Sequence, residues 1–237
     1  MRPLLIIKTG VTVPEIAERR GDFEDWIATG MGLESASLRV VRVDVGEPLP
    51  DPRQHSGVVV TGSSAMVSHR EPWSEATGGW LVRAISAGTP ILGICYGHQL
   101  LAQALGGDVA PNPKGREIGT VTVTLAQAAA SDPLLGGLPP RFPGQASHVE
   151  SVLRLPAEAV PLASTRLDPY HAFRAGARAW GIQFHPEFDA DIVRRYLHAR
   201  RAQVADEGLD VEALLADTTE TATAASVLHR FASLLEP

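Results

Sequence analysis

The stretch Ile91-Leu-Gly-Ile-Cys-Tyr-Gly-His-Gln-Leu-Leu-Ala-Gln-Ala-Leu-Gly-Gly107 decides how this chain is expected to fold. Its first residues read as a short buried strand, and a helical pattern of leucines and alanines follows at once. A pair of glycines ends that helix. Cys95 therefore stands at a tight turn from strand to helix, with Gly93 and Gly97 two residues before and after it. This is a nucleophile elbow with cysteine in place of serine, and its crowded turn requires the glycines.

The place of Cys95 at a helix N-terminus has a chemical consequence. Unpaired backbone amides and the helix dipole favour the thiolate over the thiol, which raises the reactive fraction near neutral pH. The same amides, beginning with that of Tyr96, can stabilise an oxyanion. A free cysteine is commonly an inert buried residue, and on the elbow alone that alternative stays open.

Around this stretch the chain alternates short apolar runs with helical patterns. Strands are expected at residues 4–8, 38–45, 57–61 and 91–94, the first as a buried apolar run and the second as an alternation of apolar and polar residues. Helices are expected to begin at Pro14 and Pro72, because proline suits the first helical position, and Gly21 is expected to divide the first helix. The repeated strand–helix order predicts an α/β fold with a mostly parallel open sheet and helices on both faces.

The pattern changes after residue 119. Shorter extended segments are expected at residues 120–125, 151–155, 161–164 and 178–184. Turn residues such as Pro143–Gly144 separate them, and some antiparallel pairing is expected here. Helical spacing returns after Asp189, an expected N-cap, and again from Ala224 to Leu235. We expect an α/β domain over residues 1–188 and a C-terminal helical extension over 189–237 that packs on the same domain.

Composition excludes several classes of protein. The 237 residues are 44% hydrophobic and 20% charged, with a net charge of −6, so neither nucleic acid nor an anionic membrane is an expected partner. A single cysteine cannot form an internal disulfide. No apolar run approaches the roughly 20 residues of a membrane helix, and the apolar N-terminal run is too short for a signal segment. The expected location is the reducing cytoplasm.

A nucleophile needs a base, and His185 is the candidate. The segment Trp180-Gly-Ile-Gln-Phe-His-Pro-Glu-Phe188 places it after an alternating strand, at the carboxyl end of the sheet, where open α/β sheets gather their sites. Glu187 follows closely enough to hold the imidazole by a hydrogen bond. His98 is expected to be structural. The remaining histidines are expected to be exposed or satisfied: His55, His69, His171, His198 and His229, with His148 considered below.

Together the two segments resemble the class I glutamine amidotransferase family. Gly93-Ile-Cys-Tyr-Gly-His-Gln99 matches the Gly-x-Cys-x-Gly-x-Gln elbow of that family, and His185-Pro-Glu187 matches its His-Pro-Glu, 90 residues after the cysteine. The elbow is most similar to the amidotransferase half of GMP synthase and to stand-alone relatives of it. The resemblance covers roughly residues 4–188, and it implies a flavodoxin-like sheet.

The resemblance implies roles for individual residues. It implies a catalytic triad of Cys95, His185 and Glu187, with an oxyanion hole formed by backbone amides of Tyr96 and of Ser63 or Gly62. The family often has a second glycine where Ser63 stands, so the sequence of this loop departs from the family's pattern, although a backbone N–H of Ser63 could still supply the donor. It also implies that four further residues hold the substrate: Gln99, Ser147, His148 and Val149.

The implied reaction is hydrolysis of the glutamine side-chain amide through a γ-glutamyl thioester, which releases ammonia and glutamate without a cofactor. No metal is expected, because the histidines lack paired spacing and one cysteine supplies no zinc framework. The chain has no Walker-type loop and no Ser-Gly-Gly loop of the GMP synthase kind. The ammonia is therefore expected to serve a separate synthetase, or the chain acts alone. Two alternatives stay open: a hydrolase of other γ-glutamyl compounds, and a non-catalytic binding or regulatory member.

Overall fold

The computed structural model describes residues 2–235, and eleven strands lie within them. Residues 1, 236 and 237, the outermost residues of the two expected segments, lie outside the described part. Nine strands form one sheet: β1 (Leu4–Lys8), β2 (Leu38–Arg42), β3 (Gly57–Val60), β4 (Ile91–Ile94), β6 (Glu117–Leu125), β7 (Arg141–His148), β9 (Val160–Ser164), β10 (Ala172–Ala175) and β11 (Ala179–Ile182). Two further strands pair beside it: β5 (Asp108–Pro111) and β8 (Glu150–Arg154).

The large sheet has two halves of different pairing. Its order is β2-β1-β3-β4-β11-β10-β9-β6-β7, and the first five strands run parallel. The remaining strands pair antiparallel. Parallel neighbours need a crossover, which a helix usually supplies, whereas antiparallel strands can follow one another through short turns. The predicted α/β fold with a parallel sheet is confirmed, and so is the change of pairing after residue 119.

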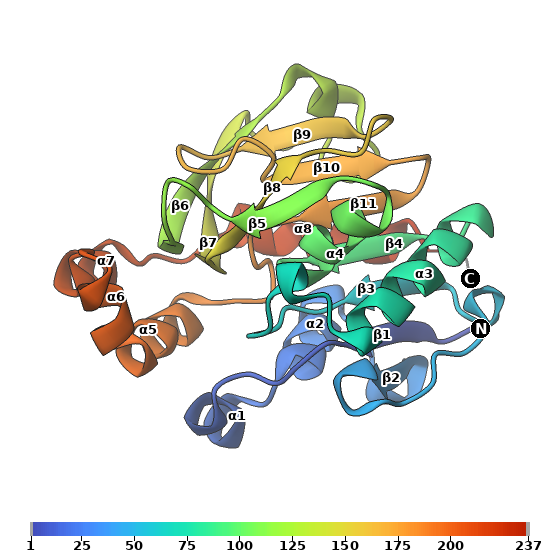
Figure 1. Cartoon of the computed structure of the whole chain (residues 1–237), viewed down its shortest axis with the longest axis horizontal. Coiled ribbons are helices and arrows are strands. Elements are labelled where there is room, and N and C mark those ends of the chain that lie inside the picture. The colour runs from blue at the N-terminus through green and yellow to red at the C-terminus, as the bar shows by residue number, and fades with distance from the viewer. Residues whose placement is uncertain (1, 236–237) are drawn as a thin grey trace.

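Helices cover both faces of the sheet (Figure 1). On one face lie α2 (Phe23–Met31) and α8 (Ala222–Ser233), and on the other lie α3 (Pro72–Ser86) and α4 (Tyr96–Ala104). Successive residues of a strand point to opposite faces, so Ile6 joins the first core while Leu5 and Ile7 join the second. Both faces are buried along β1, β3, β4 and β11, and this is why these strands are mostly apolar, whereas the edge strand β2 carries exposed residues. The remaining helices are α1 (Pro14–Arg20), α5 (Ala190–Ala199), α6 (Arg201–Asp206) and α7 (Val211–Asp217).

Two sequence expectations about strands were wrong. The strand expected at residues 38–45 ends at Arg42, because Val43–Val45 forms a turn of 3₁₀ helix. The turn expected at Pro143–Gly144 lies inside β7 instead. β7 is the last strand of the sheet, and a proline without an N–H is tolerated on such an edge. The short strands β5 and β10 were not expected.

The C-terminal helices share the core of the sheet. Asp189 caps α5, since its Oδ1 accepts a hydrogen bond from the backbone N–H of Ile192 at 2.8 Å. Phe231 of α8 is fully buried and meets the Trp180 ring edge-on, with 6.2 Å between the ring centroids. The division at residue 188 stays a prediction. Within residues 2–235 no helix is long and apolar enough to cross a membrane.

Candidate active site

The site is built on the turn between β4 and α4. Cys95 has φ of 51° and ψ of −100°, a conformation that a residue with a side chain rarely adopts. The flanking glycines are needed, because an added Cβ at Gly93 would lie 2.4 Å from the carbonyl oxygen of Gly97. One at Gly97 would lie 2.5 Å from the carbonyl oxygen of Val60. The backbone N–H of Cys95 donates to Ile182 of β11 at 2.9 Å, which fixes the elbow to the next strand.

His185 and Glu187 lie beside this turn, just beyond the end of β11. His185 Nδ1 is 2.7 Å from Glu187 Oε1, and both side chains are almost completely buried. The imidazole also stacks on the Phe188 ring at 4.0 Å between centroids. A carboxylate only accepts hydrogen bonds, so the ring nitrogen facing it carries the proton. The Glu187 carboxylate therefore fixes both the orientation and the protonation of the ring.

Electrostatics favour an ion pair between cysteine and histidine. Burial alone raises the pKa of the Cys95 thiol, but the positive charges of His185 and His148 outweigh it and lower that pKa below its ordinary value. Burial opposes the imidazolium, yet the charges of Glu187 and Cys95 raise the pKa of His185 to about 10. At neutral pH both shifts favour a thiolate beside an imidazolium, which is the reactive state of such a pair.

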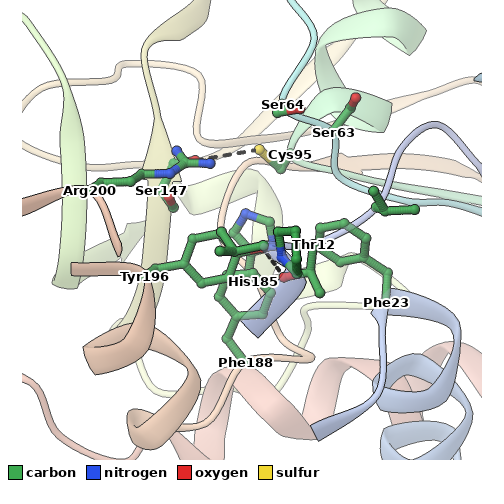
Figure 2. Close-up of a pocket in the computed structure, with 13 residues that line it drawn as sticks. Thr12, Phe23, Ser63, Ser64, Cys95, Ser147, His185, Phe188, Tyr196 and Arg200 are labelled. Atoms are coloured by element: carbon green, nitrogen blue, oxygen red, sulfur yellow. Dashed lines mark hydrogen bonds between the residues drawn. The ribbon is translucent and has the colours of Figure 1, made fainter. Parts of the chain in front are cut away.

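Two hollows meet at Cys95, and their walls differ. The larger has a volume of about 310 Å³, and Figure 2 shows the residues around it. Its walls are largely apolar and aromatic, with His185 among them, and they include Val11, Val13, Phe23, Phe188 and Tyr196. Polar residues complete these walls: Thr12, Ser63, Ser64, Ser147 and Arg200. The smaller, about 40 Å³, has polar walls that include Gln99, Ser147, His148, Val149 and Glu150. All four residues expected to hold substrate therefore border the smaller hollow.

The residues expected in the oxyanion hole lie around the same turn. Ser63 borders both hollows together with Cys95, and its Oγ donates to the Thr9 carbonyl oxygen at 2.8 Å. The Tyr96 hydroxyl is hydrogen-bonded to Ser74 Oγ at 2.6 Å, so the Tyr96 side chain is engaged away from the cysteine. Gly62 packs against His185, with only 3.1 Å from an added Cβ to His185 Cε1. A larger residue at position 62 would therefore press on the imidazole.

Gln99 is engaged by the protein itself. Its Nε2 donates to the backbone oxygen of Glu150 at 2.7 Å and to Gln183 Oε1 at 2.9 Å. Both donors of the amide are thus used. Gln99 holds the wall of the smaller hollow in place and presents no free donor there.

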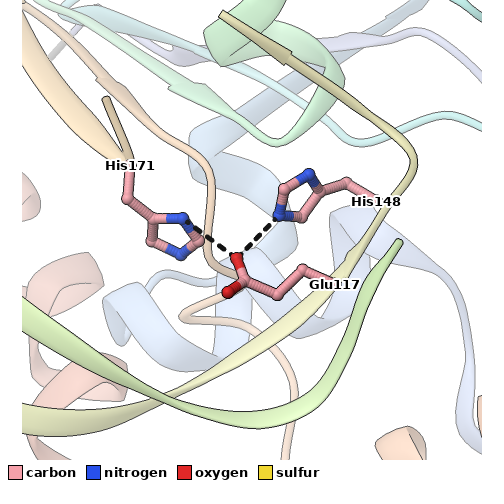
Figure 3. A group of neighbouring side chains, drawn as sticks. All are labelled: Glu117, His148 and His171. Atoms are coloured by element: carbon pink, nitrogen blue, oxygen red, sulfur yellow. Dashed lines mark hydrogen bonds and ion pairs between the residues drawn. The ribbon is translucent and has the colours of Figure 1, made fainter. Parts of the chain in front are cut away.

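One residue of that wall, His148, belongs to a buried cluster that the sequence did not predict: Glu117, His148 and His171 (Figure 3). His148 Nε2 is 3.1 Å from Glu117 Oε2, and His148 Nδ1 is 2.8 Å from the Glu150 carbonyl oxygen. Both ring nitrogens face oxygens that accept, so the doubly protonated cation satisfies both. Burial opposes that cation, but the hydrogen bond to Glu117 and the charges of Cys95 and Glu117 raise the pKa of His148. His171, expected to be exposed or satisfied, is fully buried, and neither ring nitrogen has a hydrogen-bond partner in the described part.

The cluster has metal-ligand chemistry, since its three ligand atoms lie within 4.8 Å of one another. Its hydrogen bonds argue for another role. Glu117 Oε2 already accepts from His148 and from the Thr165 hydroxyl, the latter at 3.0 Å. A doubly protonated His148 has no lone pair to offer a metal ion. The geometry fits a proton-holding network, and the expected absence of a metal stays a prediction.

Tyr196 of α5 and Arg200, the residue after its end, border the larger hollow, and the sequence analysis did not single out either of them for the site. The helical spacing predicted α5 but gave no sign that its end reaches Cys95. The hydroxyl of Tyr196 is hydrogen-bonded to Thr12 Oγ1 at 2.6 Å. This hydrogen bond joins α5 to the loop after β1, and residues of both segments line the larger hollow.

Comparison with known families identifies similar proteins. The family model described as glutamine amidotransferase class-I matches residues 22–199. A GMP synthase (glutamine-hydrolyzing) of Aeropyrum pernix is 38% identical over 158 residues, which make up 66% of this chain and 28% of that protein. A protein of Ignicoccus hospitalis, named as one of the subunits of GMP synthase (glutamine-hydrolyzing), is 41% identical over 99 residues, 41% of this chain and 50% of that protein. The chain thus spans half or less of the length of these curated relatives.

Solved structures resemble the whole chain in fold. A glutamine amidotransferase of Thermotoga maritima superposes with a TM-score of 0.77 at 22% identity, covering 98% of this chain and 97% of that one. A glutamine amido transferase of Methylobacillus flagellatus gives a TM-score of 0.79 at 22% identity, with 100% and 96% covered. The coverage includes the C-terminal helices, so the fold they share extends past the His-Pro-Glu segment.

Proposed function

The chain belongs to the class I glutamine amidotransferase family, and from this we propose that it hydrolyses the side-chain amide of glutamine through Cys95. One observation carries the proposal: Cys95 stands on a strained elbow beside a buried imidazole whose Nδ1 lies 2.7 Å from Glu187. Nucleophile, base and orienting carboxylate are the parts that covalent amide hydrolysis requires.

In the first half of the reaction the Cys95 thiolate attacks the amide carbon of glutamine. Backbone amides of Tyr96 and of Ser63 or Gly62 bind the developing oxyanion, and each such donor contributes about 3–4 kcal/mol in comparable sites. The His185 imidazolium gives its proton to the departing nitrogen. Ammonia leaves, and a γ-glutamyl thioester remains on Cys95.

In the second half neutral His185 accepts a proton from water, which attacks the thioester carbon. The carbon–sulfur bond breaks, glutamate leaves, and the thiolate–imidazolium pair is restored. Glu187 holds the ring through both halves. The smaller hollow holds the γ-glutamyl group, since Ser147, His148 and Val149 border it and His185 does not. The leaving amine must meet His185, so it departs through the larger hollow.

A separate synthetase is the proposed consumer of the ammonia. The relative from Ignicoccus hospitalis is named as one of the subunits of GMP synthase, which supports a division of glutamine hydrolysis and amination between chains. A thiolate survives only where oxidants are scarce, and this supports the reducing cytoplasm as the proposed location.

Other γ-glutamyl compounds are the second candidate substrates, and the larger hollow supports them. A cavity of about 10–15 Å³ already holds one water, a molecule about the size of ammonia, whereas this hollow measures about 310 Å³. That volume falls within the range of small-molecule sites. A leaving amine much larger than ammonia would fit beside His185.

The test is release of glutamate from glutamine by the purified protein, with and without candidate synthetases, alongside intact-mass detection of an adduct with an electrophilic glutamine analogue. Cys95→Ala is expected to abolish both signals. Ser86→Ala, an exposed position on α3, serves as the control and is expected to retain both. An active Cys95→Ala protein, or a wild-type protein that neither forms the adduct nor hydrolyses any γ-glutamyl compound, would sink the proposal.

A further inference from the structure

Arg200 stands at the junction of the two hollows. It follows the end of α5 and borders both the larger and the smaller hollow together with Cys95. Figure 2 shows its side chain extending toward the cysteine beside Ser147. The guanidinium carbon lies 5.2 Å from the centroid of the Tyr196 ring. The Tyr196 hydroxyl is held by its hydrogen bond to Thr12, so the ring against which the Arg200 guanidinium packs has a fixed position.

The guanidinium of Arg200 is unpaired, which distinguishes it from the comparable arginines. Within residues 2–235 its side chain makes no ion pair or hydrogen bond to the protein. Each of the other arginines that are buried or half-buried donates to a carboxylate or to a backbone carbonyl: Arg20, Arg42, Arg116, Arg174, Arg178, Arg195 and Arg230. Arg116, which also borders the smaller hollow, is neutralised by two bonds to Glu207 at 2.6 and 2.8 Å. Arg200 is therefore the arginine at the site that can still receive an anion.

An unpaired guanidinium in a half-buried place is unfavourable. Burial lowers the pKa of Arg200, and the nearby Tyr196 and Cys95 oppose that effect without cancelling it. Arginine does not lose its proton in proteins, so the charge persists without a hydrogen-bonded partner. Its planar fork of N–H donors matches a carboxylate, which can accept two parallel hydrogen bonds. An anionic group bound here would also lie next to the reacting sulfur.

We propose that Arg200 binds a carboxylate of the substrate and thereby makes the site specific for γ-glutamyl compounds that carry one in the right place. The proposal rests on the proposed function, because it concerns the substrate of the same cysteine. Arg200 borders both hollows, so two carboxylates fall within the same chemistry. One is the α-carboxylate of the γ-glutamyl half in the smaller hollow. The other is the carboxylate of an amino acid that leaves through the larger one.

The smaller hollow holds a group of the opposite charge. Glu150 is almost completely buried, and its Oε1 has no hydrogen-bond partner in the described part of the chain. Its other oxygen, Oε2, accepts from the backbone N–H of Ser68 at 3.3 Å. An ammonium group beside Glu150 and a carboxylate beside Arg200 would together match an amino-acid end of the substrate.

The experiment measures binding by calorimetry in a Cys95→Ala background, where no turnover consumes the ligand. Two matched pairs are compared. Glutamine and its α-amide differ only at the α-carboxylate, and γ-glutamylglycine and γ-glutamylmethylamide differ only at the carboxylate of the leaving group. Arg200→Met keeps the aliphatic stem over Tyr196 and removes the charge. It is expected to raise the Kd of the carboxylate-bearing member of at least one pair about 10- to 100-fold and to leave its neutral partner unchanged.

The control is Arg201→Met, which removes the neighbouring exposed arginine that pairs with Glu212 and is expected to change no Kd. The pair that loses its discrimination identifies which carboxylate Arg200 binds. In the active enzyme Arg200→Met should raise KM for that substrate with kcat little changed, whereas damage to the fold would lower kcat and Tm. The proposal is overturned if both pairs keep their discrimination in Arg200→Met, or if none of the four ligands binds. Carboxylate-dependent binding without any hydrolysis by wild type would refute the proposed function alone.

Discussion

Replacing Glu187 by glutamine tests the electrostatics of the site most directly. The change keeps the shape of the side chain and removes its charge. The substitution alters a short hydrogen bond that is shielded from solvent. His185 Nδ1 lies 2.7 Å from Glu187 Oε1, and only 3% and 0% of the two side chains are exposed. A hydrogen bond between charged groups contributes about 1.5–3 kcal/mol, and one pKa unit corresponds to about 1.4 kcal/mol. The pKa of His185, about 10 in the native protein, should fall by roughly one to two units.

The direction of the expected pH dependence follows from the protonation state of His185 that the reaction needs. The imidazolium is present below the pKa of His185 and is lost as pH rises through it. Activity should therefore fall at alkaline pH, and in Glu187→Gln the fall should begin one to two units lower, by the same arithmetic. The rate at neutral pH should also drop by about two to four orders of magnitude, because the glutamine amide can donate to Nδ1 and favour the wrong tautomer.

The assay is the rate of γ-amide hydrolysis from neutral to strongly alkaline pH, repeated as the rate of Cys95 alkylation. Glu212→Gln, a charge removed from an exposed position, is the control and should leave the profile unmoved. The reasoning is refuted if Glu187→Gln loses activity but its alkaline limb stays where wild type has it. That result would mean that Glu187 supports the fold of the site and does not hold the proton on His185.

Three further outcomes are expected. Glu117→Gln should lower the pKa of His148, read by NMR titration, and slow alkylation of Cys95 near neutral pH, because a cation close to the thiolate is weakened; an unchanged alkylation rate would contradict this. Gly97→Ala should destabilise the protein by several kcal/mol in urea denaturation, whereas Gly79→Ala, where the nearest atom to an added Cβ is 3.8 Å away, should stabilise it by up to about 1 kcal/mol; equal effects would count against the elbow argument. Phe231→Ala should lower the free energy of unfolding by about 3–5 kcal/mol in a single transition, whereas a separate transition for the C-terminal helices would contradict a shared core.

The parts of the site that the sequence predicted depend on short-range geometry. The need for Gly93 is local, because an added Cβ there would clash with Gly97. The need for Gly97 comes from contact with β3, but the Gly-x-Cys-x-Gly spacing already marks the turn in the sequence. His185 and Glu187 lie two residues apart, so their contact follows from one local turn. The flavodoxin-like half of the sheet likewise follows from continuous apolar runs separated by helical patterns.

The parts that were missed depend on pairing between distant segments. Glu117 faces His148 because β6 and β7 pair in that register. Reading Pro143–Gly144 as a turn removed β7 from the expected sheet, and the partner of His148 went unseen with it. Recognising an edge strand that tolerates proline would have shown the register. Arg200 had no such signal, because an arginine at a helix end ordinarily faces solvent.

The charges around Cys95 determine how the site can select a substrate. Two histidines flank the thiolate, and each is backed by its own carboxylate, Glu187 for His185 and Glu117 for His148. Each pair is neutral as a whole, and the thiolate adds a negative charge, so this group attracts no further anion. The chain as a whole carries −6, so it does not attract a carboxylate, and beyond the screening length of about 8–10 Å the charge of a single arginine has little effect either. Selection of a carboxylate must therefore arise at contact, after the substrate has entered, and Arg200 is the cation bordering both hollows whose side chain makes no hydrogen bond or ion pair to a described residue.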